Sequence, residues 1–72
     1  MDSRQGPWQK VYTTPLRYRA EIVKAVLADN HIRAVIVDKQ DTAYHFGQVE
    51  VHVTADDVMS AVKLIEDDIN FR

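Results

Sequence analysis

The stretch AVIVDKQDTAYHFGQVEVHV, residues 34–53, decides how this chain folds. It begins with residues 34–37, a continuous apolar run rich in β-branched side chains, which favours a well-covered strand. It ends with residues 48–53, in which valine alternates with polar residues. Because successive side chains of a strand point to opposite faces, one face of this second strand is apolar and the other carries Glu50 and His52. The stretch therefore predicts two strands, joined by a polar loop, in a sheet with one buried face.

A strand and a helix are predicted before this stretch. Residues 8–13 (WQKVYT) alternate large, polar and branched side chains, which is typical of a strand. Thr14-Pro15 predicts a helix start, because a threonine side chain accepts a hydrogen bond from a free N–H group and proline fits the first helical position. Apolar residues recur three and four apart through residues 15–29, and His31 tolerates the positive φ that ends many helices.

A second helix is predicted after the stretch. Thr54 is its expected cap, and Asp57, three residues later, completes a pair that resembles a capping box. The expected buried stripe of this helix consists of Val58, Ala61, Val62, Ile65 and Ile69.

The resulting order, β-α-β-β-α, predicts the fold class. A right-handed crossover makes the first two strands parallel and leaves room for the third between them, antiparallel to both. We therefore expect an α+β, ferredoxin-like split βαβ domain, with a three-stranded antiparallel sheet in the order 1-3-2 and two helices on one face. Residues 1–7 are polar and aperiodic, so we expect a disordered leader followed by a single domain over residues 8–72.

The expected topology leaves one side of the first strand unpaired. Proteins seldom leave such an edge bare, because it offers hydrogen-bonding groups to other strands. A chain of 72 residues also buries only a modest core by itself. We therefore expect a homodimer that pairs through this edge or through the open sheet face.

Composition narrows the class of protein. The chain has no cysteine and a net charge of −2 at pH 7, and no apolar run long enough to span a membrane. Its first residues lack the pattern of a secretory signal. We expect a soluble protein of the cytoplasm.

Several segments together resemble a known family. They are VYTT at residues 11–14, the helix end before residues 31–34, AVIVDKQD at 34–41, the turn at 44–47 and VEVHV at 49–53, followed by an acidic helix. Over residues 10–68 the chain resembles a small bacterial domain family of unknown function, labelled "putative prokaryotic signal-transducing proteins". The resemblance implies a ferredoxin-like fold similar to the nitrogen-regulatory PII type, and a non-catalytic regulatory or binding role. The chain departs from the family pattern in two ways. His31 stands where glycine is expected in the helix-ending turn, which concerns only the backbone conformation. The PII-like ligand loops are absent, so no family ligand is carried over.

The loop over residues 38–47 is the first candidate site, because it is long for a hairpin and rich in functional groups. A lysine offers an anion contact, an aspartate and a histidine can share a proton, and two aromatic rings offer a flat apolar surface. The candidate binding residues are Lys39, Asp41, Tyr44, His45 and Phe46. A structural reading of the same loop, with a turn at Asp41 and Phe46 closing the sheet end, stays open beside this one.

The open sheet face is the second candidate site, and its expected residues are Lys10, Tyr12, Glu50 and His52. Sheets of this topology also bind single-stranded RNA through aromatic residues. Glu50 in the middle of the face and the acidic net charge disfavour nucleic acid.

The sequence gives no basis for catalysis, a cofactor or a resident metal. It lacks a thiol, a phosphate-binding glycine loop and a nucleophile elbow. His45 and His52 with Asp41 or Glu50 would form a set of nitrogen and oxygen ligands suited to zinc, but no metal-binding spacing in the sequence supports it. We therefore expect a non-enzymatic regulatory or protein-interaction domain. The alternative is a sensor of a small anion or metabolite that uses the 38–47 loop.

Overall fold

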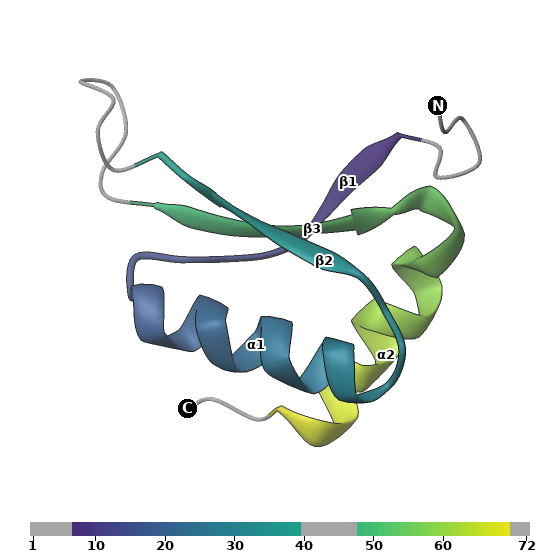
Figure 1. Ribbon diagram of the computed structural model, residues 1–72. Helices are drawn as coiled ribbons and strands as arrows, with labels where there is room; N and C mark the ends of the chain where they lie inside the picture. Colours follow the sequence, from purple (N-terminus) through teal and green to yellow (C-terminus); the bar gives the residue numbers. More distant parts are fainter. Residues whose placement is uncertain (1–6, 40–47, 70–72) are drawn as a thin grey trace.

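The computed structural model describes residues 7–39 and 48–69, and it confirms the expected fold class. Its elements are β1 (Trp8–Thr14), α1 (Arg17–Asp29), β2 (Ala34–Asp38), β3 (Val49–Thr54), the 3-10 turn η2 (Ala55–Asp57) and α2 (Val58–Asp68). The strands form an antiparallel sheet in the order β1-β3-β2. Both helices lie on the same face of this sheet (Figure 1). Segments 40–47, 1–6 and 70–72 lie outside the described residues, as do the interpretations that fall on them.

The middle strand β3 carries the core. Val49, Val51 and Val53 have no exposed surface, and they point toward the helices. Burial of each contributes roughly 1.5–3 kcal/mol relative to exposure. A shift of β3 by one residue would turn all three into water, so the pairing register of the sheet is firmly determined.

Strand β1 contains a β-bulge that changes which of its residues face the core. Lys10 pairs with His52 and Tyr12 pairs with Val51, so Val11 is the additional residue between them. In a bulge two residues of one strand oppose one residue of the other. Val11 and Tyr12 accordingly both pack against the core. The expectation that Tyr12 lies on the open face was wrong, because simple alternation does not continue through a bulge.

Helix α1 begins two residues later than the sequence predicts. Thr14 remains in β1 and pairs with Val49, and its buried Oγ1 accepts a hydrogen bond from the Leu16 backbone N–H at 3.1 Å. Leu16 is still extended, with φ −107° and ψ 108°, and the helix begins at Arg17. The Thr14 hydroxyl therefore stabilises the turn between strand and helix and does not cap the helix itself.

The end of α1 is built as the sequence predicts. His31 has φ 66°, its N–H donates to the Ala28 carbonyl oxygen at 3.0 Å, and the Ile32 N–H donates to the Leu27 oxygen at 2.9 Å. This pair of bonds is a Schellman motif, which satisfies carbonyl groups that the helix leaves free. Leu27 and Ile32 are both buried, so the turn directs the chain back into the core and toward β2.

Helix α2 is preceded by a short 3-10 turn. The Thr54 hydroxyl donates a hydrogen bond to Asp57 Oδ2 at 3.5 Å. Neither side chain accepts a hydrogen bond from a backbone N–H group of the turn or of α2, so the expected capping box does not form. Ala61 and Ile69 are buried, whereas Val62 is more exposed than its place in the expected stripe implies.

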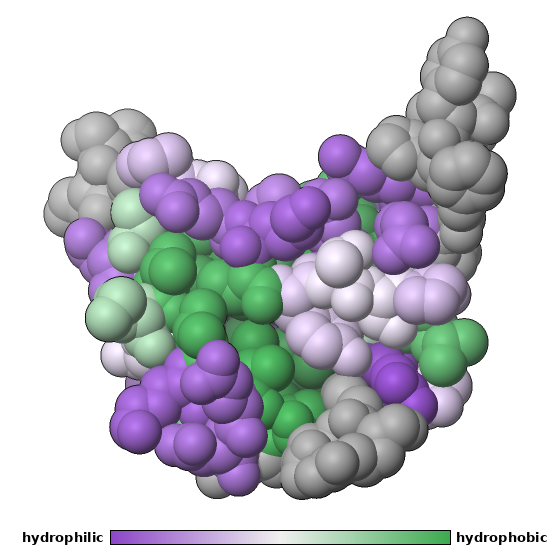
Figure 2. Space-filling view, turned by 180° about the vertical axis from the view of Figure 1, so that it is seen from behind, coloured by the Kyte–Doolittle hydropathy of each residue, from purple (hydrophilic) through white to green (hydrophobic). Residues whose placement is uncertain are grey.

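Hydrophobic residues gather in one region of the back of the molecule (Figure 2). No helix in the described residues is long and apolar enough to cross a membrane.

Candidate functional site

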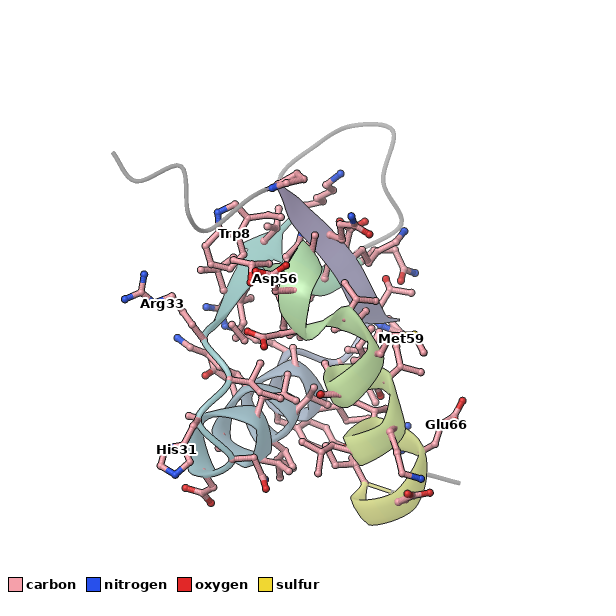
Figure 3. All side chains as sticks on the ribbon, turned by 90° about the vertical axis from the view of Figure 1, so that its right-hand side faces the viewer. Trp8, His31, Arg33, Asp56, Met59 and Glu66 are labelled. Carbon is pink, nitrogen blue, oxygen red and sulfur yellow. The ribbon has the colours of Figure 1, made fainter. Side chains whose placement is uncertain are left out.

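The side of the sheet away from the helices forms the main candidate site. No described helix or strand covers this side, and Figure 3 shows both helices below the sheet with Trp8 on the opposite side. The strand register determines which residues lie here, since paired residues of antiparallel strands point to the same face. The open face consists of Trp8, Lys10, Thr13, Val35, Val37, Glu50 and His52.

Glu50 is the centre of an ionic cluster on the open face. Its carboxylate lies 3.6 Å from Lys10 Nζ, 3.7 Å from Lys39 Nζ and 2.9 Å from His52 Nε2. The Glu50 side chain is only 12% exposed, whereas that of Lys10 is 50% exposed. Because a carboxylate can only accept hydrogen bonds, His52 Nε2–H is the donor to Glu50. The cluster joins β1, β3 and the residue that follows β2.

These contacts keep Glu50 ionised. The hydrogen bond from His52 lowers the pKa of the Glu50 carboxyl below its ordinary value of 4.5, and the positive charges of Lys10 and Lys39 act in the same direction. Partial burial acts in the opposite direction but is outweighed. Glu50 therefore carries a full negative charge at neutral pH, and most of that charge is directed at neighbouring side chains of the same chain.

Apolar side chains accompany the charges. Trp8 is 38% exposed and Val35 is 37% exposed, and Val37, which pairs with Glu50, is half-buried. Thr13 adds a hydroxyl that donates to Gln48 Oε1 at 3.2 Å. The open face thus combines two lysines and one nearly covered carboxylate with two exposed apolar groups, and of these the aromatic Trp8 is the residue type that is enriched at protein contact surfaces.

The two candidate sites predicted from the sequence meet at one residue. Lys39, from the 38–47 loop, reaches Glu50, and its backbone N–H donates to the Gln48 carbonyl oxygen at 3.0 Å. The other loop candidates lie outside the described residues: Asp41, Tyr44, His45 and Phe46. Their role stays a prediction.

Sequence reasoning did not assign Trp8 and Val35 to the site. Trp8 lies two residues before Lys10, ahead of the bulge, so alternation from Lys10 would have placed it on the open face. Val35 belongs to a continuous apolar run, in which no alternation separates the exposed residues from the buried ones. Only the pairing of Val35 with His52 reveals that it faces away from the helices.

Apart from the open face, a hollow lies between the end of α1 and α2, with a volume of about 470 Å³. Its lining includes His31, Asp57, Lys63 and Asp67. Lys63 and Asp67 form an ion pair at 3.2 Å, and both are largely exposed. Among residues 7–39 and 48–69, no three histidine, cysteine or acidic side chains are grouped to hold a metal ion.

Fold and site together define an α+β domain with an ionic cluster on its uncovered sheet face. The chain belongs to the family described as "Putative prokaryotic signal transducing protein", whose model matches residues 8–68. This confirms the resemblance inferred from the sequence, and signal transduction is the role that the family's description names. The search of curated proteins and the search of solved structures found no match.

Proposed function

We propose that this protein is a non-enzymatic regulatory domain of the cytoplasm that binds a partner protein on its open face. The observation that carries this proposal is the combination of exposed Trp8 and Val35 with Lys10 on a sheet face that no described element covers. Tryptophan at a contact surface contributes strongly to binding when a partner removes it from water. The Glu50 cluster holds the lysines in place beside it.

The charges of the open face indicate the chemistry of the partner. Lys10, Lys39 and Glu50 sum to one positive charge, although the whole chain has a net charge of −2. The exposed end of the cluster is Lys10, because Glu50 is nearly covered. A partner surface with carboxylates around an apolar residue would complement this face, and the charges would steer its approach.

The two alternatives lack a supporting observation. Binding of a small anion by the 38–47 loop requires Lys39, whose ammonium group is 3.7 Å from Glu50, together with residues outside the described part of the chain. Binding of single-stranded RNA was suggested by Tyr12 on the open face, and Tyr12 instead packs against the core.

Site-specific photo-crosslinking tests the proposal. A photoreactive phenylalanine derivative is placed at Thr13, an exposed position of the open face, and as a control at Lys24, an exposed position of α1. We expect Thr13 to yield an adduct with a protein other than this chain, and Lys24 to yield none. The added substitution Lys10→Glu should strongly reduce the Thr13 adduct. Equal adducts from both positions, or adducts that are indifferent to Lys10→Glu, would contradict the proposal.

A further inference from the structure

Strand β1, which carries Trp8 and Lys10, is an edge of the sheet. It pairs with β3 on one side, and no strand in the described residues lies along its other side. The outer side of an edge strand offers backbone N–H and C=O groups with which another extended chain can pair. A partner of the open face can therefore reach the backbone of β1 as well as its side chains.

The strand register identifies the backbone groups of β1 that point outward. The Ala55 N–H donates to the Pro7 carbonyl oxygen at 3.0 Å, so these two residues form a hydrogen-bonded pair. Along an antiparallel ladder such pairs alternate with pairs that exchange no hydrogen bond. The register is regular from Trp8 to Lys10, so these two residues belong to the second kind of pair. Their N–H and C=O groups point away from β3, and their side chains lie on the open face.

The β-bulge limits the regular part of this edge. It lies at Val11, so pairing is regular up to Lys10 and is interrupted before Tyr12. A bulge bends its strand and increases the local twist, which opposes the addition of a long, flat strand. The edge beside residues 7–10 therefore suits a short extended segment.

Lys10 indicates the charge of the segment that this edge accepts. Its side chain is half-exposed, and the Glu50 carboxylate beside it is nearly covered. Opposite charges on facing residues of an antiparallel pair are stabilising, whereas like charges are destabilising. A second copy paired here would bring its own lysine to the same short edge. An acidic segment of another protein would instead place a carboxylate beside the exposed ammonium group.

Helix α2 offers an apolar contact on the other face of the same edge. It contacts β1, and Figure 3 shows Met59 and Glu66 projecting from it on the side where β1 ends the sheet. The helix runs away from the sheet, so Met59, in its first turn, is nearer to the strands than Glu66. The Met59 side chain is 83% exposed. A residue of an added strand that points to the helix side of the sheet would cover it.

We infer that the partner of the open face adds a short extended segment to β1, antiparallel, beside residues 7–10. This inference rests on the proposed function and specifies how the partner binds. The antiparallel direction continues the existing sheet and is the more stable pairing per residue. Partner residues opposite Trp8 and Lys10 point to the open face, and the one opposite Lys10 is acidic. The residue between them points to the helix side and is apolar, because it meets Met59.

Peptides with single N-methyl groups test this inference. The probe is acetyl-Val-Glu-Val-Thr-Val-amide, titrated to millimolar concentration into the isotope-labelled chain and followed by NMR. Saturable shifts are expected at the amides of residues 8–10 and at the Met59 methyl group. The Val62 methyl groups, one turn farther along α2, should not shift.

The position of the N-methyl group distinguishes strand addition from other binding. In the inferred pairing the N–H of the glutamate points to β1, and the N–H of the central valine points away from it. N-methylation of the glutamate should weaken binding by at least about tenfold, because it removes a hydrogen bond and places a methyl group against β1, whereas N-methylation of the central valine should have no effect. An equal or reversed order of the two peptides, or no saturable shift, would overturn the inference. Shifts at residues 8–10 that depend on protein concentration without peptide would also overturn it, in favour of a second copy.

A pair of variants separates this inference from the proposed function. Lys10→Ala and Lys10→Pro both remove the ammonium group, but only proline also removes the outward N–H group. Proline is tolerated on an edge strand where its missing N–H faces away from the sheet, and equal Tm values would verify that both variants fold. Calorimetry with the protein crosslinked at Thr13 should show at least about tenfold weaker binding for Lys10→Pro than for Lys10→Ala. Equal affinities would overturn strand addition and leave the open-face contact intact, whereas absence of the Thr13 adduct would contradict the proposed function itself.

Discussion

Replacement of His31 by glycine should stabilise the protein, because His31 holds φ 66° at the end of α1. A residue with a Cβ in this left-handed region is strained by about 1–2 kcal/mol relative to glycine. Glycine also makes the unfolded chain more flexible, which costs about 0.4–1 kcal/mol. The imidazole is exposed, and both hydrogen bonds of the Schellman motif come from backbone N–H groups, so the substitution keeps them. The difference predicts a gain of about 0.5–1 kcal/mol.

For a domain of this size, that gain corresponds to a rise in Tm of about 2–8 °C, which thermal denaturation followed by circular dichroism resolves. His31→Ala keeps the strain and is expected to change the free energy of unfolding by less than about 0.5 kcal/mol. Lys24→Gly is the control inside the helix, where glycine should cost about 1 kcal/mol. A loss of stability in His31→Gly similar to that in Lys24→Gly would refute the account of this turn.

Three further predictions concern the sheet and its charges. Val51→Ala should lower the free energy of unfolding by about 2–3 kcal/mol in urea titrations, because Val51 is fully buried, whereas Val35→Ala should cost the monomer less than about 1 kcal/mol. The pKa of Glu50 is lowered in the folded state, so its ionisation contributes to the free energy of unfolding above pH 4.5. This contribution is lost as the pH falls through the lowered pKa. The difference in free energy of unfolding between the unmodified chain and Glu50→Gln should therefore shrink between pH 6 and pH 3. Arg17→Ala removes an exposed ion pair with Asp38 at 2.6 Å and should cost less than about 1 kcal/mol; a larger loss at pH 7 would show that this pair supports the packing of α1.

Much of the fold follows from local patterns in the sequence. The alternation of Val49, Val51 and Val53 identifies the core face of β3, and His31 marks the end of α1. The start of α1 does not follow from local patterns, because Thr14 is suited to two different positions. Its side chain suits a helix cap, but its pairing with Val49 keeps it in the strand, and that pairing is a contact between distant residues.

The site was predictable only where alternation is unbroken. Glu50 and His52 follow from the pattern of β3, and Lys10 follows from β1 before the bulge. Tyr12 lies after the bulge and was misplaced, because no local signal in WQKVYTT reveals an additional residue. The contact of Lys39 with Glu50 depends on the pairing of β2 with β3, and periodicity carries no information about which long side chains will meet.

The proposed contact between the open face and a partner protein centres on Trp8. The most direct measurement is the affinity of the partner recovered by crosslinking at Thr13 for Trp8→Ala and Val62→Ala, determined by isothermal titration calorimetry. Trp8 and Val62 are equally exposed, at 38% and 37%, but Val62 lies on α2. We predict that Trp8→Ala weakens binding by about thirtyfold, as expected for a contact worth about 2 kcal/mol, and that Val62→Ala has no effect. Equal affinities for the two variants, or a loss with Val62→Ala alone, would contradict the claim.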